Sequence, residues 1–249
     1  MLASERRDLI LELLGGEGRV VASDLAPRLG VSLDTVRRDL DGLAAAGALR
    51  RVHGGALPLG AALRRPPDRV DVDATHAIAA AACSLVHPGA VVLLGGGTAV
   101  LELARRLPGD LRATIVTSAP GVAVALLDHR SLEVVLLGGR VHAATRTVIG
   151  GEAVDTLRSL RADLCLLGSC SLHAEAGLTA GDREEAIVAR AMIERSSQTA
   201  VLADASGLGA GGAHVVGAAE AVDVLVTDVT APAEALAGLV ALGIEVIRV

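Results

Sequence analysis

The sequence contains no Phe, Tyr or Trp, and all 23 of its basic side chains are Arg, with no Lys. Without aromatic rings the protein cannot stack nucleic-acid bases or build an aromatic cage. Without Lys it can form no Schiff base and has no Walker-type phosphate-binding lysine. Its core must therefore be built from Leu, Val, Ile and Ala.

Cysteine is also scarce, since Cys83, Cys165 and Cys170 are the three present and they form no CxxC pair. An odd number of scattered cysteines fits reduced thiols in the cytoplasm better than a disulfide framework. The N-terminus has no signal-peptide core, and the most apolar stretch, residues 77–94, is interrupted by His-Pro-Gly. We therefore expect a cytoplasmic protein without a membrane span.

What is present suits one or two globular domains: 249 residues, 51% of them hydrophobic and 21% charged. The formal net charge is −6, but it is unevenly distributed. Residues 1–65 hold ten Arg and eight acidic side chains, whereas residues 66–249 hold thirteen Arg and twenty-one acidic side chains. The N-terminal part is therefore the one suited to binding phosphate groups.

Three amphipathic helices are expected in this N-terminal part. Apolar residues recur at helical spacing over residues 9–14. Ser23 is expected to cap a second helix that Gly30 ends, and Ser32 to cap a third that runs to about Gly47.

The second and third helices have the spacing of a helix-turn-helix. Ala26, Gly30 and Val36 stand as A-x3-G-x5-V, in which Ala permits close helix approach, Gly permits positive φ, and Val anchors the second helix. The face of the third helix opposite Val36 is polar and is predicted to enter a DNA major groove. The candidate DNA-contacting residues here are Ser32, Asp34, Thr35, Arg37 and Arg38.

A basic β-hairpin is predicted directly after these helices. Residues 49–52 form the expected first strand, Gly54 and Gly55 the turn, and Ala56 begins the return strand. On such a wing, Arg50, Arg51 and His53 would reach the DNA backbone or a minor groove.

A plainer alternative is that the i,i+4 pairs Asp34 with Arg38 and Arg37 with Asp41 form a merely solvated helix surface. The helix spacing, the turn glycine and the basic hairpin, occurring in this order, favour DNA binding. The segment VSLDTVRRDLDGLAAAGALRRVHGGA resembles the winged helix-turn-helix of the deoxyribose-operon-repressor (DeoR) family of bacterial regulators. The family's Ser-x-x-Thr-hydrophobic-Arg-Arg-Asp-Leu motif matches residues 32–40, and its His-Gly-Gly matches residues 53–55.

Beyond this module, three domains or segments are expected: a DNA-binding domain at 1–57, a Pro-containing linker at 58–73, and an α/β domain at 74–249. In the last of these, apolar runs of strand length alternate with helical stretches, which predicts a mostly parallel sheet covered on both faces. The expected strands are Val91–Leu94, Ala113–Thr117, Leu132–Leu137, Asp163–Gly168, Thr199–Ala203, Val222–Thr227 and Ile244–Val249.

Ligands of such sheets bind beyond the carboxyl ends of the strands. The glycine-rich segment that follows the first strand opens a helix, so its free backbone N–H groups suit a small anion. The sequence has neither a Rossmann fingerprint nor a GK[ST] motif, so a sugar phosphate is the better expectation. The strand-end candidates are Gly95, Gly96, Gly97, Thr98, Thr117, Ser118, Gly138, Gly139, Gly168, Asp204 and Ser206.

The resemblance to the DeoR family continues through this half, from GGGTAVLELARRL to VLADASGLG. It implies a sensor domain similar in fold to ribose-5-phosphate isomerase and CoA transferase, which oligomerises and binds a phosphorylated sugar that weakens DNA binding. It also adds Asp182, Glu185 and Arg190 to the candidate effector-binding residues.

The chain departs from the family pattern at places that would face the ligand. The family has Asp-x-Gly-Thr-Thr at residues 95–99, Thr-Asn at 117–118, Lys-Arg at 189–190 and Asp-x-Ser-Lys at 204–207, and this chain keeps only part of each. Two of the missing groups are ammonium groups, which form the stronger, charge-assisted hydrogen bonds to phosphate. We therefore expect a retained cleft with altered or weakened effector binding.

The sequence thus predicts a sequence-specific DNA-binding repressor of sugar-metabolism genes, which acts on double-stranded operator DNA as a homodimer or tetramer. The acidic run 182–185 has one alternative interpretation as catalytic carboxylates, but an acidic first helical turn favoured by the helix dipole explains it as well. No catalytic residue, metal or cofactor is expected. The alternatives are a sugar-phosphate isomerase with a helical extension, and a regulator whose sensor site has decayed.

Overall fold

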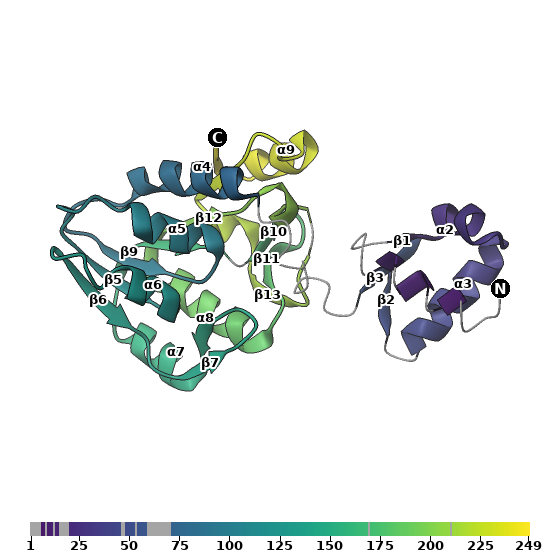
Figure 1. Cartoon of the computed structure of the whole chain (residues 1–249), viewed down its shortest axis with the longest axis horizontal. Coiled ribbons are helices and arrows are strands. Elements are labelled where there is room, and N and C mark those ends of the chain that lie inside the picture. The colour runs from purple at the N-terminus through teal and green to yellow at the C-terminus, as the bar shows by residue number, and fades with distance from the viewer. Residues whose placement is uncertain are drawn as a thin grey trace. The chain divides into compact units, whose positions relative to one another are not determined.

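The computed structural model describes residues 6–7, 9–11, 13–14, 20–45, 48–52, 54–58, 71–168, 170–209 and 211–249, with backbone only at residues 45, 50, 52, 57 and 58. The chain divides into two compact units, residues 1–64 and 65–249 (Figure 1). Most of the expected linker lies outside the described residues. The second unit's first helix begins at Val72, two residues before the predicted domain start.

The first unit has the predicted helices and wing. Its described residues between 6 and 14 are helical, and α2 (Ala22–Leu29) and α3 (Leu33–Ala45) follow. The wing strands β2 (Leu49–Val52) and β3 (Gly55–Pro58) pair antiparallel as expected. A two-residue strand that the sequence analysis missed, β1 (Val20–Val21), pairs with the other side of β3.

The start of α2 corrects one expectation. The residue before the helix is Val21, which supplies no side-chain cap, and Ser23 lies inside the helix with its hydroxyl donating to Asp24. Pairing of β1 with β3 fixes the chain up to Val21, so the helix begins directly after the strand. The expected end is confirmed, because Gly30 takes the left-handed conformation with φ of 65°.

The second unit contains a seven-stranded, wholly parallel sheet in the order β15-β14-β12-β9-β4-β5-β6. All seven predicted strands are present. The main difference is that β12 begins at Ser196, because polar residues there continue the ladder with β9. The strands are β4 (Val91–Leu94), β5 (Ala113–Thr117), β6 (Leu132–Leu136), β9 (Ala162–Leu167), β12 (Ser196–Leu202), β14 (Val224–Thr227) and β15 (Glu245–Arg248).

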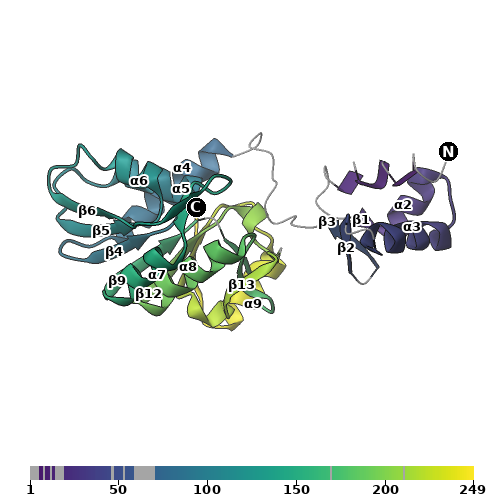
Figure 2. The ribbon, with the colours of Figure 1, turned by 90° about the horizontal axis from the view of Figure 1, so that it is seen from below.

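Helices cover both faces of this sheet, as predicted (Figures 1 and 2). Within β4, Val92 and Leu94 join the core on one face, and Leu93 joins the core on the other. The first face carries α4 (Val72–Ala82), α5 (Thr98–Arg106) and α6 (Pro120–Ala125); the second carries α7 (Gly151–Arg158), α8 (Arg183–Glu194) and α9 (Ala233–Ala241).

Among the described residues of the second unit, five short strands and three 3-10 turns were not predicted, because segments of three or four residues show no usable periodicity. The strands β7 (Arg140–His142) and β8 (Thr147–Ile149) pair with each other, whereas β10 (Ser171–His173), β11 (Gly177–Ala180) and β13 (His214–Gly217) form a small antiparallel sheet. The 3-10 turns are Cys83–Leu85, Ala205–Gly207 and Ala219–Ala221. In the described residues, no helix is both long enough and apolar enough to span a membrane.

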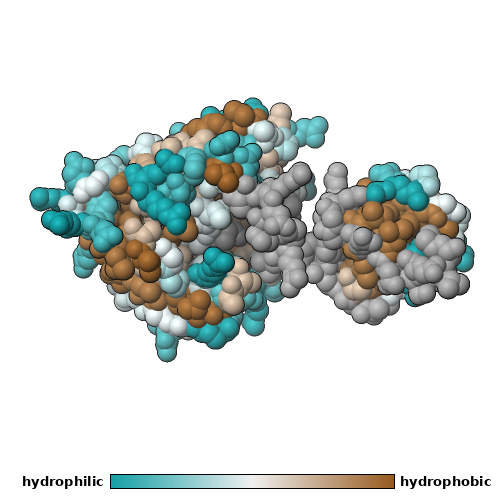
Figure 3. All heavy atoms as spheres, viewed as in Figure 1, coloured by the Kyte–Doolittle hydropathy of each residue, from teal (hydrophilic) through white to brown (hydrophobic). Residues whose placement is uncertain are grey.

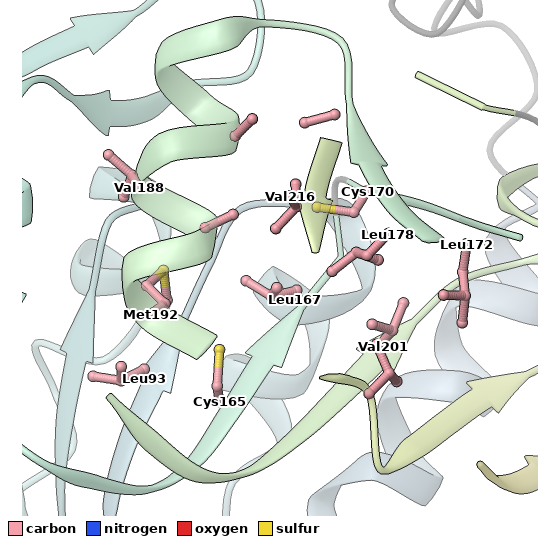
Figure 4. Close-up of a cluster of buried hydrophobic side chains, with 14 of the residues drawn as sticks. Leu93, Cys165, Leu167, Cys170, Leu172, Leu178, Val188, Met192, Val201 and Val216 are labelled. Atoms are coloured by element: carbon pink, nitrogen blue, oxygen red, sulfur yellow. The ribbon is translucent and has the colours of Figure 1, made fainter. Parts of the chain in front are cut away.

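The core contains the small aliphatic residues that an aromatic-free sequence requires. Figure 4 shows Met192 of α8 close to Leu93 and Cys165 of the central strands, in a buried cluster that also includes Val188. Cys170 is fully enclosed, and burial raises the pKa of its thiol to about 12. A thiol that stays protonated is unreactive, which agrees with a packing role for this residue.

Candidate functional site

The N-terminus of α3 is fixed by its cap. The backbone N–H of Thr35 donates to the Ser32 hydroxyl at 3.2 Å, and the two hydroxyls lie 2.9 Å apart. Ser32 thus has the capping role that the sequence predicts. In the free protein its hydroxyl is committed to the helix.

The predicted DNA-facing surface of α3 is exposed. Asp34 and Arg38 form an ion pair of 2.6 Å, and both side chains lie largely in solvent. Arg37 is also exposed and has no ion-pair partner among the described residues. Of the candidate residues on this helix, Arg37 is therefore the cation most available to an incoming ligand.

The opposite side of α3 holds a charge cluster that the sequence analysis missed. Asp39 is 4% exposed. Its carboxylate accepts from Arg6 Nε at 2.5 Å and from Arg7 Nε at 3.2 Å. Its position three residues after Val36 was a usable signal, because that spacing places it on the buried stripe. These contacts fix the angle between the first helix and α3.

The wing is tied to α3 by Arg51. Its Nε donates to Asp41 Oδ1 at 2.7 Å and its Nη1 donates to the Gly55 carbonyl at 2.6 Å. Asp41 thus pairs with Arg51 and not with Arg37, the partner suggested by helical spacing. The Arg50 side chain and all of His53 lie outside the described residues, so their predicted roles stay predictions.

In the second unit, the predicted glycine-rich loops interlock at the carboxyl ends of β4 and β9. Gly168 N–H donates to the Gly96 carbonyl at 3.1 Å. Gly97 has a φ of 116°, and a Cβ on it would lie 2.5 Å from the Gly168 carbonyl carbon. Close packing thus requires glycine at positions 97 and 168, whatever these loops bind.

We expect Gly97→Ala to destabilise the second unit by about 3 kcal/mol, because it adds both backbone strain and a steric clash. Thermal unfolding followed by circular dichroism measures the effect. Gly109→Ala is the matched control, since nothing lies within 4 Å of a Cβ there. An unchanged midpoint for Gly97→Ala would contradict the packing role.

Thr117 and Ser118 follow β5 but differ in role. Thr117 is fully buried, and its hydroxyl donates to the Leu94 carbonyl at 2.7 Å and accepts from the Ala119 N–H at 3.0 Å. Its hydroxyl is thus used by the backbone in the protein interior. Ser118 is also buried but lines a small void beside Gly95 and Gly96.

That void has a volume of about 10 Å³, room for about one water molecule. Helix α8 closes it with Val188, Ala189 and Met192, and the buried carboxyl side chain of Glu185 also lines it. Of the predicted anion cradle, Gly95 and Gly96 are thus enclosed beneath α8 beside an acidic residue, whereas Thr98 is exposed. A void of this size is too small for a sugar phosphate.

Asp182 caps α8, accepting from the backbone N–H groups of Glu184 at 2.9 Å and Glu185 at 3.0 Å. Partial burial acts to raise the pKa of Asp182, but these hydrogen bonds and the nearby His142 and His214 outweigh it and lower that pKa. The acidic run therefore has the helix-start geometry that the sequence analysis gave as the non-catalytic interpretation.

Polar side chains from β7 and β8 approach the same helix start. His142 Nδ1 lies 3.0 Å from the Thr145 hydroxyl. The Thr145 hydroxyl in turn lies 2.8 Å from the Thr147 hydroxyl, and Thr147 lines the void. Arg140 pairs with Glu184. The sequence analysis did not select these residues, because β7 and β8 are too short for periodicity to reveal.

The remaining candidates are dispersed. Arg190 donates from Nε to the Val216 carbonyl at 2.8 Å and from Nη2 to the Val215 carbonyl at 2.6 Å, so it binds β13. Asp204 accepts from the Ser206 N–H at 2.9 Å in a turn after β12. Gly138 and Gly139 follow β6, and Thr98 is exposed at the start of α5.

A residue near this turn was missed. Asp228, which follows β14, is 4% exposed and accepts from the Ala205 N–H at 2.7 Å and the Thr230 N–H at 2.7 Å. Burial acts to raise its pKa, but the hydrogen bonds from Thr230 and Ala205 lower the pKa of Asp228 overall. Its carboxylate thus holds the loops after β12 and β14 together.

A larger, open groove of about 380 Å³ lies at the other edge of the sheet, where α5 and α6 end. Arg105, His129 and Arg130 line it together with Asp128. Cations near the negative ends of two helices are expected for electrostatic reasons alone.

Two family models match the chain. A DeoR-like helix-turn-helix domain matches residues 6–59, and a DeoR C-terminal sensor domain matches residues 71–229. The chain belongs to the DeoR family. It is therefore a transcriptional regulator with a DNA-binding head and a sensor domain, as the sequence predicted.

Curated DeoR relatives match over nearly full length. The HTH-type transcriptional regulator GlpR of Haloferax volcanii is 32% identical, covering 99% of this chain and 98% of its own. The putative aga operon transcriptional repressor of Escherichia coli O157:H7 is 31% identical, covering 99% and 94%. These relatives are named as regulators and not as enzymes.

Among solved structures, the chain is similar to ribose 5-phosphate isomerase A of Methanocaldococcus jannaschii. The two are 19% identical, with 54% of this chain and 53% of that chain covered and a TM-score of 0.36.

Proposed function

We propose that α3 and the wing of this DeoR-family protein bind operator DNA directly, with Arg37 and Arg38 reading the major groove and Arg50, Arg51 and His53 holding the flanking backbone. The observation that carries the proposal is the solvent-facing Arg37, on a helix whose opposite side is fixed by Asp39. Rigid placement of a cationic helix face is what base recognition requires.

We further propose that the protein is a cytoplasmic repressor that works as a homodimer or tetramer and is released by a phosphorylated sugar. The effector would bind at the carboxyl edge of the sheet, near Gly95, Gly96, Ser118 and the start of α8. Because the void there holds about one water, binding requires α8 to shift. A ligand that binds only the shifted form changes the population of conformations, which is the linkage that release from DNA needs.

A second candidate, a regulator that responds to no sugar phosphate, is favoured by the same observations. The void is small, Arg190 is engaged with β13, and the family's two ammonium groups are absent. Calorimetric titration of the full chain with pentose and hexose phosphates separates the two candidates. Saturable binding supports the first, and its absence across the series supports the second.

We expect Glu185→Gln to strengthen binding of a sugar phosphate about tenfold, because it replaces a carboxyl group by a neutral amide that can donate a hydrogen bond to the phosphate, while keeping the side-chain volume. The same titration measures the change. Glu234→Gln, on the exposed start of α9, is the control and should leave the affinity unchanged. Equal or weaker affinity in Glu185→Gln would place the ligand elsewhere.

A further inference from the structure

One edge of the parallel sheet is left unpaired. β6 is the last strand in the sheet order, and it pairs with β5 on one side. No strand in the described part of the chain pairs with its other side. The outward N–H and C=O groups of such an edge are a template for another strand.

This edge has few of the features that normally keep edge strands from pairing. Its sequence, LEVVL, has no proline and one charge, and the carboxylate of that residue, Glu133, accepts a hydrogen bond from Thr114 at 3.2 Å. The opposite edge strand, β15, carries Glu245 and Arg248 within four residues. Charges on an edge discourage pairing. Of the two edges, β6 is therefore the one suited to pairing.

An exposed apolar surface adjoins β6. Val124 of α6 is 66% exposed, Leu127 just after α6 is 73% exposed, and Leu136 at the end of β6 is 45% exposed. Helix α6 lies beside β6 in both ribbon views, and apolar residues gather around α6 in the space-filling view (Figures 1, 2 and 3). Leu132 and Val134 of β6 pack against the core on this same face. We call these five residues the apolar edge surface.

We propose that a second copy of this chain binds the apolar edge surface, with β6 running antiparallel to β6 of the partner about a two-fold axis perpendicular to the sheet. Two identical edges related in this way satisfy each other's backbone groups. The proposal rests on the proposed function in one respect: an operator-binding repressor with paired heads needs a symmetric assembly of its sensor domains.

Repulsion between like charges and the number of paired residues together favour one register of the β6–β6 pair. With Val134 opposite itself across the axis, all five residues of each strand are paired, and Leu132 faces Leu136 of the partner subunit. Glu133 then faces Val135 of the partner subunit. In a register centred on Glu133, the Glu133 carboxylates of the two copies would lie directly opposite each other, and such a pair of like charges destabilises a sheet. A register centred on Val135 would leave fewer residues paired.

The first test measures the mass of the full chain by light scattering after gel filtration. Leu127 and Leu136 are exposed, so changing both to Glu tests the interface with little disturbance of the core. We expect the wild type to be at least a dimer and the double variant to have half its mass. Val240→Glu, on a 56% exposed residue of α9, is the control and should keep the wild-type mass. A wild-type monomer, or a double variant with unchanged mass, would overturn the proposal.

The second test examines the register by disulfide formation in a Cys83→Ser background, in which the two remaining cysteines are buried. Val134→Cys is expected to cross-link with itself. Leu132→Cys is expected to form a disulfide only with Leu136→Cys, in a mixture of the two variants. In the proposed register the two copies of residue 132 lie four residues apart, about 13 Å along the strand, which is too far for a disulfide. Cross-linking of Leu132→Cys with itself but not of Val134→Cys would overturn the register.

Failure of this inference differs from failure of the proposed function. A chain that binds operator specifically but keeps its mass in the double variant retains the function and loses the interface. A chain that dissociates as expected but binds no DNA retains the interface and loses the proposed function.

Discussion

Replacing Arg37 by Ala is expected to weaken operator binding by about 1–3 kcal/mol, a loss of roughly five- to 150-fold. Arg37 is the exposed α3 cation that has no ion-pair partner among the described residues, so binding DNA breaks no existing pair. Fluorescence anisotropy with a labelled operator, compared with a scrambled duplex at the same salt concentration, measures the loss.

Three comparisons make the Arg37 result interpretable. Loss of a base contact lowers affinity for operator more than for the scrambled duplex, whereas loss of a phosphate contact lowers both and reduces the salt dependence. Arg38→Ala should have a smaller effect, because its guanidinium is already paired with Asp34 at 2.6 Å. Arg158→Ala, on the exposed surface of α7, should have none. Unchanged operator affinity in both Arg37→Ala and Arg38→Ala would mean that α3 is not the recognition helix.

Replacing Asp39 by Ala is expected to destabilise the head by about 3–5 kcal/mol, because it leaves Arg6, only 12% exposed, without its carboxylate. A domain of about 60 residues has little stability to lose, so the head should become largely unfolded. DNA binding would then fail although Asp39 faces away from the DNA-binding surface. The second unit, with its separate core, should keep its stability.

Hydrogen exchange with mass spectrometry resolves the two units and needs no tryptophan, which this chain lacks. In Asp39→Ala, peptides from α2 and α3 should exchange much faster, while peptides from the central strands stay protected. Asp34→Ala is the matched control, since its pair with Arg38 is exposed and contributes within about 0.5 kcal/mol. Wild-type exchange rates throughout the head of Asp39→Ala would contradict the structural role of this cluster.

Strong local signals made the architecture predictable from the sequence. Each of the seven central strands contains an apolar run, and the turn at Gly30 and the cap at Ser32 each have a recognisable chemical cause. The failures have equally local causes. Ser23 looked like a cap because nothing in the sequence revealed that Val20–Val21 would pair with the wing.

The sites were less predictable, because a residue's type does not reveal which neighbour will use it. Thr117 follows a strand like a ligand-binding residue, yet its hydroxyl is enclosed between Leu94 and Ala119. Arg190 is held by β13, a strand too short to anticipate. The closing of Gly95 and Gly96 by α8 depends on long-range packing, which no spacing in the sequence encodes.

The most direct test of the account is capture of genomic DNA fragments by the purified full chain, with and without a mixture of sugar phosphates, at one fixed moderate salt concentration. Salt must be held constant because non-specific binding depends on it steeply. The account predicts enrichment of a few sites that contain repeated half-sites, and loss of that enrichment when the mixture is added. Absence of enrichment in both conditions would contradict it.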